Sequence, residues 1–203
     1  MIRAFLAVEL PVEIRQALAL VQTDVKNRIS RELSPRMRLQ WVRPESVHLT
    51  VKFLGDIQET QVHDLQSVVG EALRSVAPFS IEVAGLGVFP DMHAPRVLWV
   101  GLVGRAGIGG PPTALLQLVN MVETSVEPLG YPPETRPFNQ HLTLARIKEG
   151  SKEVGRAIAR IGLLEREVPL GQLEVSRVAL MRSELKPSGS VYTTLWEIPL
   201  GAA

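Results

Sequence analysis

Two matching tetrapeptides, one in each half of the chain, constrain its fold more than any other feature of the sequence. They are His48-Leu49-Thr50-Val51 and His141-Leu142-Thr143-Leu144, and they contain two of the four histidines. With nine threonines in 203 residues, the chance that two histidines are each followed by threonine two positions later is roughly one in a hundred, before the shared leucine is counted. The repeat therefore indicates two related halves, each placing the same side chains on a strand.

The rest of the chain alternates between helical and strand-like spacing of apolar residues. Apolar residues at steps of three and four predict four helices, which follow Pro11, Thr60, Pro112 and Ser151, with Thr60 as a helix cap. This order predicts an α+β fold rather than a repeated β-α-β unit. We expect one two-lobed domain, 1–203, whose halves meet near 104–112. The predicted strands are 2–10, 38–43, 47–54, 79–89, 96–103, 141–147, 173–181 and 191–198.

Composition and charge exclude several classes of protein. The chain has a net charge of +1 and no cysteine, which excludes a disulfide scaffold, a cysteine nucleophile and a cysteine-ligated metal. The near-neutral charge is not that of a protein that coats nucleic acid without specificity. The N-terminal segment lacks the features of a secretory signal, and no stretch is apolar enough to cross a membrane. We expect a cytoplasmic protein with no membrane association and no obligate protein partner.

Side chains two positions apart on a strand share one face of the sheet. The spacing therefore predicts that His48, Thr50 and Lys52 share a face, which we expect to line a cleft. If a pseudo-twofold axis relates the halves, His141 and Thr143 form the matching pair on the opposite wall. The other face of the first strand is expected to point into the core with Val47, Leu49, Val51 and Phe53.

Two imidazoles and two hydroxyls on facing strands suit phosphate chemistry. An imidazole has an ordinary pKa of about 6.5, so one ring can be neutral and the other protonated, as general base and general acid. Threonine hydroxyls, helped by a nearby Arg or Lys, can hold the non-bridging oxygens of a phosphate. In-line cleavage of a phosphodiester needs one group to deprotonate the attacking oxygen and another to protonate the leaving oxygen. Two histidines facing each other across a cleft meet that need.

Several alternatives remain open from the residues alone. A zinc site is a poor interpretation, since there is no third nearby histidine, no cysteine and no His-x-x-x-His spacing. Both tetrapeptides could instead be ordinary surface strands. Segment 24–52 has seven cations against three anions, which fits either an RNA-facing strip or solvated charge. Further candidates for substrate contact are Phe138, Tyr192 and His93, which lies in a turn-rich segment; their alternative roles are packing or exposure to solvent. We expect His63 to be exposed to solvent.

The sequence around the tetrapeptides resembles a known family. The phrases WVRPESVHLTVKFLGDI, GLGVFPDMHAPRVLWVGL and RPFNQHLTLARI are similar to the RNA 2′,3′-cyclic phosphodiesterases, also known as 2′-5′ RNA ligases, of the 2H phosphoesterase superfamily. The resemblance extends over most of the chain. It implies a bilobal, duplicated α+β fold, with an antiparallel sheet in each lobe around a central groove and the helices outside.

The resemblance also implies roles for individual residues. His48 would be the proton donor and His141 the proton acceptor in hydrolysing a 2′,3′-cyclic phosphate to a 2′-phosphate, with no metal or other cofactor. Thr50 and Thr143 match the threonines that hold the phosphate, and Arg146 matches a basic residue that follows the second motif.

The leading hypothesis is therefore a metal-independent enzyme that opens 2′,3′-cyclic phosphates at RNA ends and, by mass action, catalyses reverse 2′-5′ ligation. Two alternatives are kept beside it. One is a module that binds RNA ends without turnover. The other is a 2H enzyme that acts on small cyclic nucleotides or 2′-5′ oligonucleotides.

Overall fold

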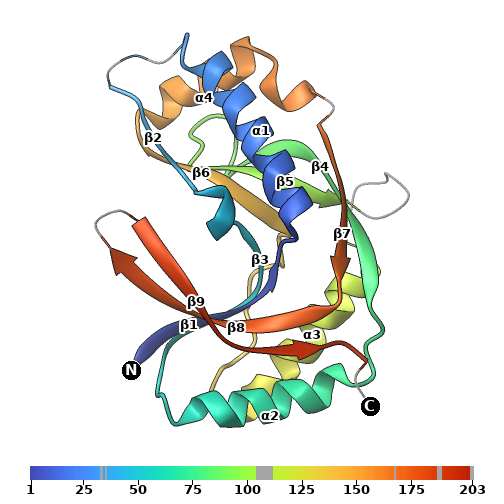
Figure 1. Ribbon diagram of the computed structural model, residues 1–203. Helices are drawn as coiled ribbons and strands as arrows, with labels where there is room; N and C mark the ends of the chain where they lie inside the picture. Colours follow the sequence, from blue (N-terminus) through green and yellow to red (C-terminus); the bar gives the residue numbers. More distant parts are fainter. Residues whose placement is uncertain (33, 35, 104–111, 167, 187–188, 202–203) are drawn as a thin grey trace.

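The computed structural model describes residues 1–203 except 33, 35, 104–111, 167, 187–188 and 202–203. The described chain forms two antiparallel sheets with α-helices on their outer sides (Figure 1). In chain order the elements are β1 (Ile2–Glu9), α1 (Val12–Ile29), β2 (Arg38–Trp41), η1 (Pro44–Ser46), β3 (His48–Ile57), α2 (Gln61–Leu73), β4 (Phe79–Phe89), β5 (Val97–Val103), α3 (Thr113–Val126), η2 (Glu127–Leu129), β6 (His141–Glu149), α4 (Ser151–Arg160), η3 (Leu163–Glu165), β7 (Pro169–Val175), β8 (Arg177–Lys186) and β9 (Gly189–Pro199).

The two sheets form two lobes. The first sheet has the strand order β3-β1-β8-β9, and the second has the order β2-β6-β5-β4-β7. Helices α2 and α3 pack on the first sheet, whereas α1 and α4 pack on the second (Figure 1). The predicted α+β class, with an antiparallel sheet in each lobe and the helices outside, is confirmed.

Both lobes draw elements from both ends of the chain. Strands β1 and β3 of the first sheet are joined by β8 and β9 from the end of the sequence. Helix α1 follows β1 of the first sheet but packs on the second, and α3 follows β5 of the second sheet but packs on the first. This exchange ties the lobes together. The predicted junction near 104–112 falls almost entirely on 104–111, outside the described residues.

Most predicted elements are confirmed, and two local predictions are wrong. The segment 173–181, expected as one strand, is the end of β7 and the start of β8, because the chain leaves one sheet and joins the other at Ser176. Thr60 makes no side-chain capping hydrogen bond. Instead, the Gln61 side chain accepts a hydrogen bond from the Gln58 backbone N–H, 3.2 Å away, at the start of α2.

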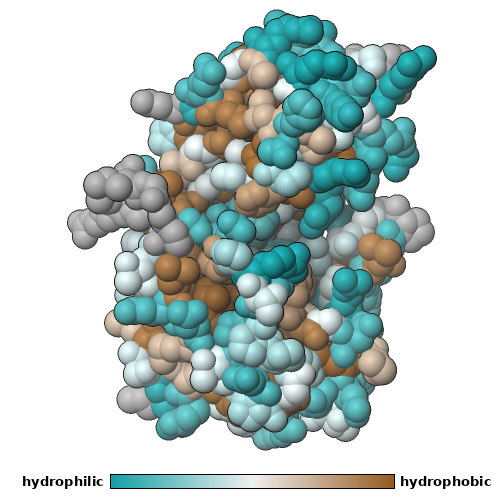
Figure 2. Space-filling view, turned by 180° about the vertical axis from the view of Figure 1, so that it is seen from behind, coloured by the Kyte–Doolittle hydropathy of each residue, from teal (hydrophilic) through white to brown (hydrophobic). Residues whose placement is uncertain are grey.

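Apolar side chains from both sheets and all four helices form one continuous core. A smaller cluster of Phe5, Ala7, Ala179 and Met181, with Tyr192 packed against it, lies on the opposite face of the first sheet. On the side of the molecule away from the view of Figure 1, hydrophilic side chains cover much of the surface and apolar patches emerge between them (Figure 2). None of the helices in the described ranges has the length and apolarity needed to span a membrane.

Candidate active site

A cleft of about 680 Å³ lies between the two sheets. All five predicted site residues line it: His48 and Thr50 from β3, and His141, Thr143 and Arg146 from β6. The two tetrapeptides therefore face a shared space from different lobes, as the sequence predicts.

Each cleft histidine is held by a backbone carbonyl two residues before it. His48 Nδ1 lies 3.0 Å from the Ser46 carbonyl oxygen, and His141 Nδ1 lies 2.7 Å from the Asn139 carbonyl oxygen. A carbonyl oxygen can only accept, so Nδ1 bears the proton in both rings, which leaves Nε2 as the unprotonated nitrogen of the neutral form. The two halves thus present the same nitrogen for chemistry.

Aromatic rings fix the orientation of both imidazoles. The His48 ring stacks on the Phe5 ring, with the two centroids 4.6 Å apart. It also makes an edge-to-face contact with the Tyr192 ring, whose centroid lies 5.0 Å from that of His48. Phe89 meets the His141 ring edge to face at 5.0 Å. Aromatic packing of this kind restricts rotation of the imidazole. The tetrapeptides did not reveal these neighbours, because they come from other strands.

The surroundings of both histidines disfavour the charged imidazolium. The pKa of His48 is lowered from 6.5 to about 4, mainly by burial and with smaller contributions from Arg146 and the neighbouring His141, while the Ser46 carbonyl opposes the shift. Burial and the Arg146 charge also lower the pKa of His141, against the opposing effect of the Asn139 carbonyl. Both rings are therefore neutral near pH 7 in the free protein.

A β-bulge brings Arg146 to the cleft. In the β5–β6 pairing, Trp99 lies opposite Thr143 and Leu98 lies opposite Ala145, so Leu144 is an extra residue. A bulge of this kind reverses the alternation of side chains after it. Ala145 consequently points into the core, and Arg146 shares the cleft face with Thr143 although the two are three positions apart.

The first tetrapeptide has the same irregularity, and the predicted faces of Lys52 and Phe53 are wrong for this reason. Ala7 lies opposite Thr50 and Leu6 lies opposite Lys52, so Val51 is the extra residue. Phe53, expected in the core, lines the cleft with 73% of its surface exposed. Lys52, expected in the cleft, is buried. Strict two-residue alternation fails wherever a bulge intervenes.

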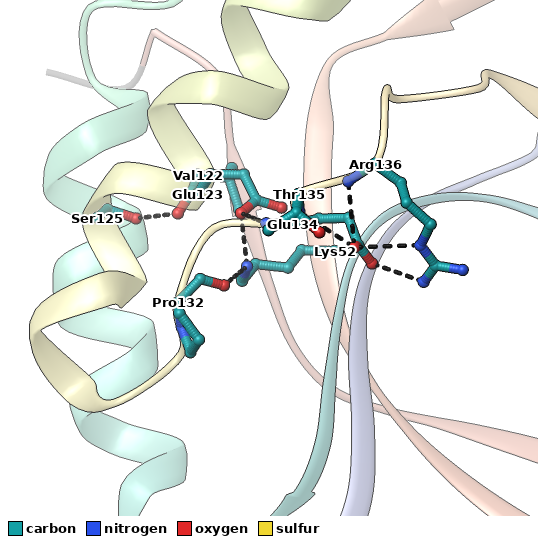
Figure 3. A network of polar contacts seen from close by, with 8 residues as sticks. All are labelled: Lys52, Val122, Glu123, Ser125, Pro132, Glu134, Thr135 and Arg136. Atoms are coloured by element: carbon teal, nitrogen blue, oxygen red, sulfur yellow. Dashed lines mark hydrogen bonds and ion pairs between the residues drawn. The ribbon is translucent and has the colours of Figure 1, made fainter.

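Lys52 ends in a buried ion pair with a helix of the same lobe. Its Nζ lies 2.6 Å from Glu123 Oε2 on α3 and donates a second hydrogen bond, 2.9 Å long, to the Pro132 carbonyl. Glu123 also accepts a hydrogen bond from the Glu134 backbone N–H, 3.0 Å away. This network anchors the segment that leads from α3 towards His141 (Figure 3).

Gln22 of α1 supports the bulge of the second motif. Its Nε2 donates to the Val42 carbonyl at 2.7 Å and to the carbonyl of Leu144, the extra residue, at 3.0 Å. Gln22 and Lys52 are the two buried polar side chains found in the described part of the chain. The sequence held a signal for Gln22, because it lies four positions after Leu18 on the apolar face of a predicted helix.

The other candidates from the sequence have different surroundings. His93 and Phe138 do not line the cleft, and Phe138 packs against the main core. His63 is exposed on α2, as expected. Tyr192 lines the cleft, where it contacts His48. Of the cations in segment 24–52, only Arg43 is among the cleft-lining residues.

Among the described residues, no group of three or more His, Asp or Glu side chains is arranged to hold a metal ion. The ion pairs found in the same residues all involve cations other than Arg146. Arg146 lines the cleft and its positive charge acts on both histidines, so its guanidinium is available to a ligand beside them. An anion is the ligand that this arrangement favours.

Two antiparallel sheets that present matching His-x-Thr pairs to one cleft define the class of 2H phosphoesterases. The sequence matches the family model of LigT like Phosphoesterase over residues 8–99 and 108–192. The chain therefore belongs to the LigT-like phosphoesterase family and is a hydrolase of that class.

Relatives in other organisms cover almost the whole chain. An RNA 2′,3′-cyclic phosphodiesterase of Methanothermobacter thermautotrophicus is 34% identical over 194 residues, which is 96% of each protein. One of Aquifex aeolicus is 35% identical over 88% of this chain and 90% of its own length. The crystal structure of a Thermus thermophilus protein has a TM-score of 0.75 at 32% identity, with 98% of both chains covered. Escherichia coli LigT complexed with 3′-AMP shares the fold, with a TM-score of 0.72 at 23% identity and 99% coverage of both chains.

Proposed function

We propose that this enzyme hydrolyses 2′,3′-cyclic phosphates at RNA ends to 2′-phosphates by paired histidine catalysis. The observation that carries the proposal is the matched geometry of His48 and His141, each with Nδ1 held by a carbonyl and Nε2 left for chemistry on opposite walls of one cleft. The names of the relatives support the choice of substrate.

The reaction requires one proton transfer on each side of phosphorus. His141 Nε2 accepts a proton from water as the water oxygen bonds to phosphorus. The bond between phosphorus and O3′ breaks, and protonated His48 donates its Nε2 proton to O3′. The products are a 2′-phosphate and a free 3′-hydroxyl, and His48 ends neutral while His141 ends protonated. Transfer of that proton through solvent resets the pair.

The remaining cleft residues stabilise the phosphate during this step. Thr50 and Thr143 lie two positions after their histidines on the same strand faces, where their hydroxyls can donate to the non-bridging oxygens. Arg146 supplies positive charge as negative charge builds up on phosphorus. The same groups catalyse attack of a 5′-hydroxyl in place of water, which breaks the same bond between phosphorus and O3′ and forms a 2′-5′ linkage.

The proposal is tested with protein treated with EDTA and an oligoribonucleotide that ends in a 2′,3′-cyclic phosphate. The expected product is the 2′-phosphate, formed at the same rate with and without EDTA. A 3′-phosphate product would reverse the assigned leaving oxygen, and loss of activity with EDTA would contradict a metal-independent reaction. Binding of the RNA without turnover would favour the binding-module alternative. Turnover limited to a cyclic mononucleotide or a 2′-5′ dimer would favour the small-nucleotide alternative.

We expect the pH optimum of kcat/KM to lie below 6.5. The reaction needs one neutral and one protonated histidine, so activity falls below the lower pKa and above the higher one. Since the pKa of His48 is lowered to about 4 and that of His141 is also lowered, both limbs of the profile move to the acid side of the ordinary histidine value. A profile of kcat/KM between about pH 3.5 and 9 measures both limbs.

Arg146→Gln separates the effect of charge on the pH profile from its effect on rate. Removing this positive charge raises the pKa of both histidines, so the limbs shift to higher pH whatever the loss in maximal rate. Arg43→Gln, a change at another cleft-lining cation, is the control, because Arg43 is not among the charges that shift either histidine. Unchanged limbs in Arg146→Gln would show that Arg146 does not set the histidine pKa values.

A further inference from the structure

Among the described residues of α1, one polar side chain lies in the buried stripe of the helix. The stripe consists of Ile14, Leu18, Gln22, Val25 and Ile29, and Gln22 is 2% exposed. An aliphatic residue would fill the same space with no polar group to satisfy, whereas an amide without hydrogen bonds is costly to bury. The reason for a glutamine at this position therefore lies in what its amide contacts.

Both contacts of this amide are backbone carbonyls of the second lobe. Gln22 Nε2 donates to the Val42 carbonyl at 2.7 Å and to the Leu144 carbonyl at 3.0 Å. The Leu144 carbonyl also accepts a hydrogen bond from the Val42 backbone N–H, 2.9 Å away. Leu144 is the extra residue of the β6 bulge and is fully buried. Because buried carbonyls need donors, Gln22 stabilises the backbone at the point where β6 departs from regular pairing.

The first lobe has a buried polar contact at the equivalent place. Lys52 follows the extra residue of the β3 bulge and pairs with Glu123 on α3. In β6 the residue after the bulge is Ala145, which has no polar group, and the polar side chain comes instead from the helix as Gln22. Helices α1 and α3 each follow a strand of one sheet and pack on the other. Each of the two buried polar side chains found in the described part of the chain therefore joins a bulge to such a helix.

We propose that Gln22 is a positioning residue, whose two hydrogen bonds hold the β6 bulge and thereby keep Arg146 on the cleft face. This proposal rests on the proposed function, in which Arg146 supplies positive charge to the phosphate. The bulge places Arg146 there, because the alternation of side chains reverses after Leu144. Gln22 itself does not line the cleft, so its effect on the reaction passes through Arg146.

The pKa values of the two histidines report the position of Arg146, because its positive charge lowers both. Gln22→Met keeps the length of the side chain and removes both donors. We expect this variant to raise the pKa of His48 and of His141, as Arg146→Gln does, and by no more than Arg146→Gln. NMR titration of the imidazole C–H signals measures these values without turnover. The value of kcat/KM should also fall, by up to roughly 10²-fold, since a misplacement of about 1 Å can have that effect.

A double variant separates positioning from a general loss of stability. In the Arg146→Gln background the charge is already absent, so adding Gln22→Met should cause no further change in either histidine pKa. Tyr131→Phe is the matched control, because it removes a part-buried hydrogen bond, 2.9 Å long, to Gln61 Oε1 at α2. It should lower the melting temperature and leave both pKa values unchanged, since neither Tyr131 nor Gln61 lines the cleft.

Thermal melting shows whether each variant is folded, and Gln22→Leu, which matches the aliphatic stripe of α1, is the second variant. Wild-type histidine pKa values in a folded Gln22 variant would overturn the proposal. An equal rise in pKa with and without Arg146 would also overturn it, because Gln22 would then act by another route. Failure of the proposed function would look different: wild-type protein would not hydrolyse a cyclic-phosphate RNA end, although the pKa differences between the variants persisted.

Discussion

Replacing either His48 or His141 with alanine is expected to lower kcat by roughly 10²- to 10⁴-fold, the usual effect of losing a general acid or base. The two imidazoles act in one proton-transfer cycle. The kcat of the double variant should therefore be only slightly lower than that of the less active single variant. Turnover of an oligoribonucleotide with a 2′,3′-cyclic phosphate end, measured near the pH optimum, gives the values.

The chain provides its own control for this experiment. His63→Ala removes an exposed histidine on α2 and should change kcat less than twofold. Because the His48 ring stacks on Phe5, alanine at this position leaves a gap, and His48→Gln serves as a second variant that keeps polar bulk. Thermal melting confirms that each variant is folded. Wild-type turnover in a folded variant of either cleft histidine would refute the catalytic assignment.

Periodicity and the repeated tetrapeptide predicted the elements, the α+β class and two related halves, whereas the antiparallel sheets with helices outside followed from the family resemblance. The apolar spacing after Pro11 and Pro112 marks α1 and α3, and the pairing of like motifs places His48 and His141 on facing walls. These features depend on residues close in sequence. The partner sheet of each helix was not predictable in this way, because α1 and α3 pack on the lobe opposite to the strand before them.

The predictions of side-chain direction were wrong where the strand departs from regular two-residue alternation. A bulge depends on the register between two strands, and nothing in His48-Leu49-Thr50-Val51 shows that Val51 has no partner on β1. The errors at Lys52 and Phe53 both follow from this one extra residue. If the two motifs are aligned over two more positions, Phe53 falls at the position of Arg146. The alternation of buried and exposed residues shifts at the same point in both strands.

Lys52→Met is expected to lower the free energy of unfolding by about 3–5 kcal/mol, the usual cost of leaving one partner of a buried ion pair unpaired. The side chains of Lys52 and Glu123 are 4% and 13% exposed, with their charged atoms 2.6 Å apart. The variant leaves a carboxylate at the edge of the core with the Glu134 backbone N–H as its remaining hydrogen bond in this network. Urea denaturation measures the change.

Two further variants show whether burial of the ion pair causes the expected loss of stability in Lys52→Met. Arg38→Met breaks the pair with Glu149, whose side chains are 69% and 58% exposed, and exposed pairs contribute at most about 1 kcal/mol. Replacing both Lys52 and Glu123 with apolar residues removes the stranded charge, so the double variant should be more stable than Lys52→Met alone. A Lys52→Met variant no less stable than Arg38→Met would mean that solvent reaches the pair.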